Sequence, residues 1–183
     1  MIVAIDTSSL LSLVRYYLPF DKNNVLYDNI KVKILHGEIL LLDKVIEECQ
    51  YTSQGIVLKS IDYLKEKKTH IKTIDLLPSK KFFNQLENNF CNASWKNQLT
   101  PAEFENRKNA FLESADAKLL LYCLKYKGEK PLEKITIISE ESEASNDNKA
   151  FKKLPAICKM LDIEIITLPD LLKLYDDINV EFK

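Results

Sequence analysis

The chain has 183 residues, 46% of them hydrophobic, which predicts one globular domain with a core that needs no disulfide or metal to fold. Its formal net charge of −1 and its three glycines give no overall attraction to nucleic acid or membrane and no glycine-rich phosphate loop. The four cysteines lie outside any C-x-x-C spacing, which disfavours a zinc site and indicates a reduced, cytoplasmic protein. We expect Cys49, Cys123 and Cys158, which stand in apolar helical patterns, to be core residues.

The first part of the chain alternates apolar runs with helical patterns. Residues 2–5, Ile-Val-Ala-Ile, predict a buried strand, and this run is too short to span a membrane. We expect Ser8 or Ser9 to cap the helix that follows. Apolar spacing predicts a second helix over residues 23–35, and residues 39–42 predict another buried strand.

The middle of the chain carries weaker patterns. Apolar residues at helical spacing predict a helix over residues 54–67, and β-branched residues favour a strand over 71–77. Thr100 is the clearest helix start, since Pro101 follows it and Glu103 stands three residues later. This combination is typical of a capping box with proline at the first helical position.

The last part of the chain returns to regular alternation. A helix is predicted over residues 115–127, followed by strands over 135–138 and 163–168 with a helix between them. Strands that alternate with helices predict a parallel sheet covered on both faces. The expected fold class is therefore α/β, with three layers in the order α/β/α.

Acidic residues follow the predicted strands or begin the helices after them, at Asp6, Glu47, Glu48, Asp116, Glu140 and Glu141. Ligands of open α/β sheets bind beyond the carboxyl ends of the strands, so these acids can converge there. Clustered carboxylates repel one another, and Mg²⁺ or Mn²⁺ would relieve that repulsion through oxygen ligands. Each acid alone also fits a structural role, such as a helix cap for Asp6 or a favourable helix-dipole charge for Asp116.

Four motifs in this order resemble the PIN domain family of metal-dependent nucleases: "VAIDTSSLL", "VIEECQ", "SADAKLLLYCL" and "TIISEES". Two further segments, "YYLPFD" and "KKLPAICKMLDIEIITLPDLL", look like the PIN-like branch known as DUF4411. The resemblance covers about residues 1–50 and 110–175. It implies one PIN-like domain over residues 1–183, in which about residues 52–105 form a helical insert.

The resemblance implies a Mg²⁺- or Mn²⁺-dependent endoribonuclease, as in the toxin of a toxin–antitoxin pair. Its catalytic residues would be Asp6, Glu48, Asp116 and Glu141. Asp6, Asp116 and Glu141 would bind the metal, and the hydroxyl groups of Ser8 and Ser139 would fix those carboxylates. Many relatives carry Asp in the fourth motif, where this chain has only glutamates. The alternative acids are Glu47, Glu140 and Glu143.

The expected partners are an RNA substrate and an antitoxin protein, and a homodimer is compatible with the resemblance; no membrane partner is expected. Local lysines near the proposed site, Lys149, Lys152 and Lys153, are the first candidates for RNA phosphate contacts. The alternative function is a catalytically inactive PIN-like scaffold that binds RNA or a protein partner. A phosphatase with an aspartyl nucleophile is disfavoured, because it needs a second Asp where this chain has Ser8.

Overall fold

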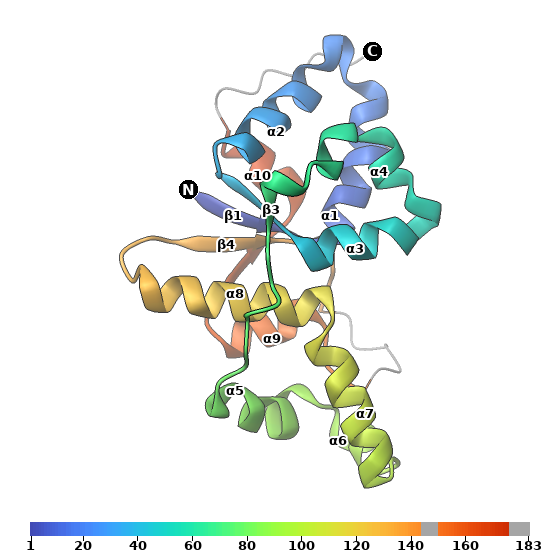
Figure 1. Cartoon of the computed structure of the whole chain (residues 1–183), viewed down its shortest axis with the longest axis vertical. Coiled ribbons are helices and arrows are strands. Elements are labelled where there is room, and N and C mark those ends of the chain that lie inside the picture. The colour runs from blue at the N-terminus through green and yellow to red at the C-terminus, as the bar shows by residue number, and fades with distance from the viewer. Residues whose placement is uncertain (144–149, 176–183) are drawn as a thin grey trace.

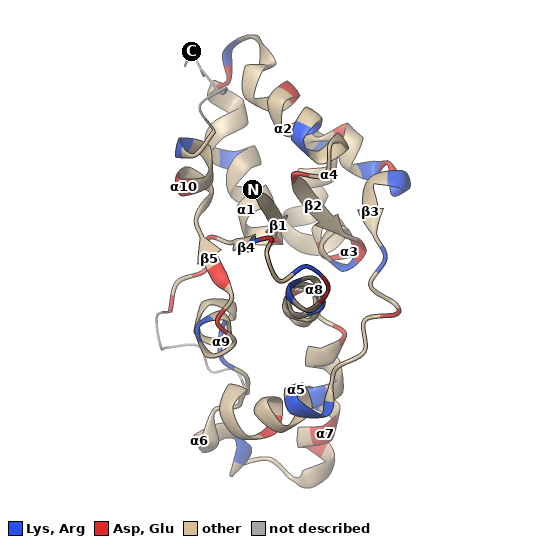
Figure 2. Cartoon of the chain, turned by 90° about the vertical axis from the view of Figure 1, so that its left-hand side faces the viewer, with Lys and Arg blue, Asp and Glu red and all other residues tan. Residues whose placement is uncertain are grey.

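The computed structural model describes residues 1–143 and 150–175. They form a five-stranded parallel sheet in the order β3-β2-β1-β4-β5. Its strands are β1 Ile2–Ile5, β2 Ile39–Leu42, β3 His70–Ile71, β4 Ile135–Ile138 and β5 Glu164–Ile166. In Figures 1 and 2, α2, α4 and α10 lie on one side of the sheet and α8 and α9 on the other. The predicted α/β/α architecture is thus confirmed.

The helices account for most of the described chain. The α-helices are α1 Thr7–Ser12, α2 Val25–Leu35, α3 Asp43–Tyr51, α4 Ile56–Ser60, α5 Lys80–Gln85, α6 Ala93–Lys96, α7 Pro101–Leu112, α8 Ala115–Glu129, α9 Leu154–Met160 and α10 Leu168–Lys173. Short 3₁₀ or π segments are Leu13–Tyr17, Leu18–Phe20, Lys22–Asn24, Thr52–Gly55, Asp62–Lys65, Lys67–Thr69 and Leu86–Phe90. No helix in the described ranges is long and apolar enough to cross a membrane.

The two central strands, β1 and β4, are buried on both faces, as their apolar runs predict. Ala4 pairs with Ile137, and Ile5 pairs with Ile138; all four of these side chains are fully buried. This register sets the carboxyl ends of β1 and β4 at the same level. The residues that follow them, Asp6 and Ser139, therefore emerge side by side at one edge of the sheet.

The strand predicted over residues 71–77 is wrong in extent, because β3 ends at Ile71. The backbone N–H and the hydroxyl of Thr73 donate to Asp43 Oδ1 at 3.2 and 2.6 Å, so the Thr73 N–H pairs with a side chain instead of with a neighbouring strand. Beyond it, Ile74 and Leu77 are 81% and 83% exposed. Their β-branched and apolar pattern resembled a strand, but these two side chains face solvent.

The predicted helix over residues 54–67 is broken into short pieces around α4. Ser53, Gln54 and Gly55 all have positive φ, a conformation that interrupts a right-handed helix. At Gly55, an added Cβ would lie 3.1 Å from the carbonyl oxygen of Gln50. The chain therefore turns sharply between α3 and α4. Inside the predicted range, Ile61 leaves the helical conformation, with φ −124° and ψ 86°, and ends α4.

Helix caps are partly as predicted. Thr100 and Glu103 form the expected capping box of α7. At the start of α1, however, the cap is Asp6 rather than Ser8 or Ser9, since its carboxylate accepts the N–H groups of Thr7 and Ser8. A carboxylate directly after a strand meets the free N–H groups of the next helix and satisfies them.

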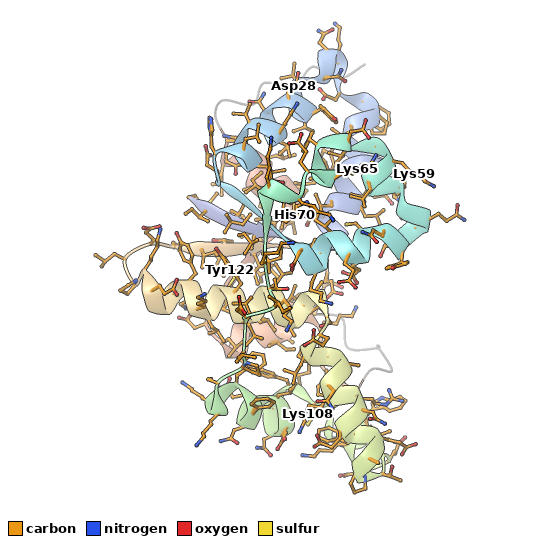
Figure 3. All side chains as sticks on the ribbon, viewed as in Figure 1. Asp28, Lys59, Lys65, His70, Lys108 and Tyr122 are labelled. Carbon is orange, nitrogen blue, oxygen red and sulfur yellow. The ribbon has the colours of Figure 1, made fainter. Side chains whose placement is uncertain are left out.

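The segment predicted as a helical insert contributes edge strand β3 as well as helices. Figures 1 and 2 show α5, α6 and α7 together beyond α8 and α9, away from the sheet. The buried ammonium of Lys108, placed among these helices in Figure 3, pairs with Glu87 at 2.8 Å and Glu105 at 2.7 Å. An antiparallel bridge from Cys91 to Phe151 then ties this group to the segment before α9.

Candidate functional site

Asp6 stands at the end of β1 and is only 4% exposed. Its Oδ1 accepts the Thr7 N–H at 2.7 Å. Its Oδ2 accepts the hydroxyl groups of Ser8 at 2.6 Å and Ser139 at 2.9 Å. The two serines named from the sequence as positioning residues therefore both contact the first predicted acid. Together they hold a buried charge between the carboxyl ends of β1 and β4.

A cavity of about 390 Å³ lies next to this network. Three of the four predicted acids line it, namely Glu48 from α3, Asp116 from the first turn of α8, and Glu141 after β4. Basic residues line the same cavity, namely Arg107, Lys152 and Lys153, with the aromatic residues Phe111 and Phe151 beside them. The residues that line the cavity thus come from segments that are far apart in the sequence.

Asp6 is not a lining residue of this cavity, but it belongs to the same electrostatic environment. Burial is the main reason that the pKa of the Cys158 thiol is raised to about 12. The negative charges of Asp116, Asp6 and Glu141 contribute to this raised pKa, in that order. The three predicted metal ligands therefore lie within electrostatic reach of one buried sulfur atom. Cys49, Cys123 and Cys158 are free and buried, as expected, and so is Cys91.

The adjacent residues Glu47 and Glu48 have different surroundings. Glu48 Oε2 accepts the Thr7 hydroxyl at 2.6 Å, which fixes the side chain that lines the acidic cavity. Glu47 instead pairs with Lys44 at 2.9 Å and lines a separate cavity beside His70. Of these two glutamates, only Glu48 lines the cavity that contains Asp116 and Glu141.

The acidic residues after β4 also contact different parts of the fold. Glu140 Oε1 accepts the backbone N–H of Leu168 at 2.6 Å, at the start of α10. Glu141 Oε2 accepts the backbone N–H of Leu154 at 3.2 Å, at the start of α9, and this side chain lines the cavity. Glu143 is exposed on the loop and does not line the cavity. Of these three glutamates, Glu141 is the one that faces the other predicted acids.

Only some of the basic residues that line the cavity were predicted from the sequence. Lys152 and Lys153 line the cavity, and the Lys152 ammonium donates to the carbonyl oxygen of Asn89 at 2.6 Å. Lys149 lies outside the described residues. Arg107 also reaches the cavity, from α7, and was not among the residues predicted from the sequence. No local motif singles out Arg107, although arginine is rare in this chain.

The residues around the cavity suit a hard divalent cation by their chemistry. They offer carboxylate oxygens, which Mg²⁺ and Mn²⁺ prefer. Within residues 1–143 and 150–175, no three His, Cys, Asp or Glu side chains form a group that could hold one ion together. Mg²⁺ commonly uses one or two carboxylates and completes its shell with water and substrate phosphate. The carboxylates of Glu48, Asp116 and Glu141 that line the cavity therefore suit such an ion by the chemistry of their oxygen atoms.

Comparison with known proteins gives one match. Residues 3–176 match the family described as "Domain of unknown function (DUF4411)". No curated protein matches the chain significantly, and neither does any solved structure. The family match covers the cavity and the segments that line it, but its description assigns no activity to them.

Proposed function

This chain belongs to the DUF4411 family, and we propose that it is a PIN-like endoribonuclease that depends on Mg²⁺ or Mn²⁺. The observation that carries the proposal is the cavity lined by Glu48, Asp116 and Glu141 together with Arg107 and Lys153. Acidic and basic groups in one cavity match the two needs of phosphodiester cleavage, which are cation binding and phosphate binding. An antitoxin partner remains a prediction from the resemblance.

The acidic residues have separable roles in this proposal. Asp116 and Glu141 would hold the cation. Asp6, which the sequence also suggested as a metal ligand, does not line the cavity and would instead add a buried negative charge next to it. When bound, the cation would act as a Lewis acid and lower the pKa of a water molecule. Glu48, fixed by the Thr7 hydroxyl, would orient the attacking water. Carboxylates oriented by hydrogen bonds are the usual arrangement around catalytic metals.

A catalytically inactive scaffold that binds RNA or a protein is the second candidate. One observation favours it: the Glu141 carboxylate already accepts a hydrogen bond from the N-terminus of α9. A purely structural Glu141 would leave Asp116 as the main cation ligand in the cavity. The scaffold would bind RNA through its basic residues without any dependence on divalent cations.

Substitution of the neighbouring glutamates separates these functions. We expect Glu48→Gln to reduce Mn²⁺-dependent cleavage of a labelled single-stranded RNA at least about tenfold, a typical loss for groups that position a metal site. The Glu47→Gln variant is the matched control, because Glu47 lines a different cavity, and it should cleave like the wild type. Initial cleavage rates would be measured on gels with Mn²⁺, with Mg²⁺ and with EDTA.

Two results would count against the nuclease. One is a wild-type protein that cleaves no RNA with either ion, which would favour the scaffold. The other is equal activity in Glu47→Gln and Glu48→Gln, which would mean that the cavity is not the site of cleavage. Thermal melts would show that both variants are folded; both positions are exposed on α3.

A further inference from the structure

The chain uses arginine and tryptophan very sparingly. It has 26 lysine and arginine residues in total, and only Arg15 and Arg107 are arginines; Trp95 is the single tryptophan. In a chain this rich in lysine, an arginine that lies on the only tryptophan points to the particular chemistry of the guanidinium group. That group is planar, stacks on aromatic rings and carries donors arranged to bind two phosphate oxygens at once.

Arg107 and Trp95 meet beside the acidic cavity. The central carbon of the Arg107 guanidinium lies 5.6 Å from the centroid of the Trp95 ring, within the range of a cation–π contact. Arg107 is exposed and lines the cavity that contains Glu48, Asp116 and Glu141. In the described part of the chain, no acidic side chain forms an ion pair with Arg107.

The contact with Trp95 leaves the N–H donors of the guanidinium available, because a cation–π contact is not a hydrogen bond. The guanidinium carries five such donors in a fixed planar arrangement. Lys152, in the same cavity, already donates to the carbonyl oxygen of Asn89. Among the basic residues of the cavity, Arg107 alone has a planar fork of donors that can bind an incoming anion through two parallel hydrogen bonds, whereas Lys152 and Lys153 each carry a single ammonium group.

We propose that Arg107, held over the ring of Trp95, binds a backbone phosphate of the RNA in the acidic cavity. This inference rests on the proposed function in that it takes RNA as the ligand of the same cavity. The ring of Trp95 orders the long arginine side chain before the ligand arrives, which lowers the entropic cost of binding. Arg107 is thus a substrate-binding residue supplied by α7, in the group of helices that lies away from the sheet.

The test measures RNA binding without cleavage. A short fluorescein-labelled oligouridylate is titrated with protein in EDTA, and fluorescence anisotropy gives the dissociation constant from about 50 to 200 mM salt. Arg107→Gln should weaken binding about tenfold, the usual effect of losing a charged hydrogen bond. It should also reduce the salt dependence of log K by about 0.7, the value for one phosphate contact on a single strand.

Three further variants make the result specific. Arg107→Lys keeps the charge but loses the planar donors, so its affinity should lie between those of the wild type and Arg107→Gln. Trp95→Leu should also weaken binding, because it removes the ring that orders Arg107. Arg15→Gln is the matched control: Arg15 is exposed and donates to Ser53 at 2.6 Å, and it does not line the cavity. Its affinity should equal that of the wild type.

The inference is overturned if Arg107→Gln binds like the wild type, if Arg15→Gln weakens binding equally, or if the wild type does not bind the RNA. Because the measurement is made in EDTA, it is independent of catalysis. If the wild type binds RNA through Arg107 but never cleaves it with Mg²⁺ or Mn²⁺, the nuclease proposal fails and the phosphate site stands. If the wild type cleaves RNA but Arg107→Gln binds it normally, only this inference fails.

Discussion

Replacing Asp116 by Asn is expected to reduce Mn²⁺-dependent RNA cleavage at least about a hundredfold, since residues that only support metal ligands already contribute about 10- to 100-fold. The substitution keeps the size of the side chain and removes its charge. Ser114, not Asp116, caps α8, so the fold should persist, with a loss of about 1 kcal/mol from the helix dipole. Cleavage rates and urea unfolding would be measured on the same preparation.

Asp170→Asn provides the control for helix effects. Asp170 also lies in the first turn of a helix, α10, but outside the acidic cavity. Its substitution should change stability by a similar small amount and leave cleavage unchanged. An Asp116→Asn protein that retains full metal-dependent activity would exclude Asp116 as a cation ligand.

Replacing Asp6 by Ala should lower the free energy of unfolding by about 3 kcal/mol. Loss of the α1 cap costs about 1 kcal/mol. The hydroxyl groups of Ser8 and Ser139 also lose their buried acceptor, and leaving buried donors without a partner costs about 1–3 kcal/mol. Urea unfolding would measure this loss. Below the unfolding transition, the folded variant should also be inactive, because the buried charge behind the cavity is gone.

Asp21→Ala distinguishes the two effects of Asp6. Asp21 is another buried aspartate, 2% exposed, whose carboxylate accepts the N–H groups of Leu26 and Tyr27 at 3.1 and 3.0 Å. Its removal should cost about 1–2 kcal/mol as a lost cap, without loss of cleavage by the folded protein. If both alanine variants lose stability and both retain activity, Asp6 has a structural role only.

Local sequence patterns were enough to predict strands that are buried on both faces and helix caps whose partners are close in sequence. Apart from Thr136, β1 and β4 consist of apolar residues because both faces of a central parallel strand are covered. An apolar run in the sequence is therefore enough to predict their positions. The Thr100 capping box is equally local, since all its partners lie within four residues. The order of acids after strands also follows from the alternation of strands and helices.

Features that depend on distant residues could not be predicted in this way. The early end of β3 reflects hydrogen bonds from Thr73 to Asp43, in a different part of the chain. The different surroundings of Glu140 and Glu141 depend on where α10 and α9 begin in space. Arg107 reaches the cavity only because α7 packs near the segment around Phe151, and no pattern near residue 107 encodes that contact.

The most direct test of the central claim is a calorimetric titration of Mn²⁺ into the wild type, Glu140→Gln and Glu141→Gln. Both glutamates accept a backbone N–H at a helix start, and glutamine keeps an oxygen that can accept it, but only Glu141 lines the cavity. We predict that the wild type and Glu140→Gln bind Mn²⁺ alike and that Glu141→Gln binds it at least about tenfold more weakly. Absence of binding by the wild type at millimolar Mn²⁺, or equal binding by both variants, would contradict a cation site in this cavity.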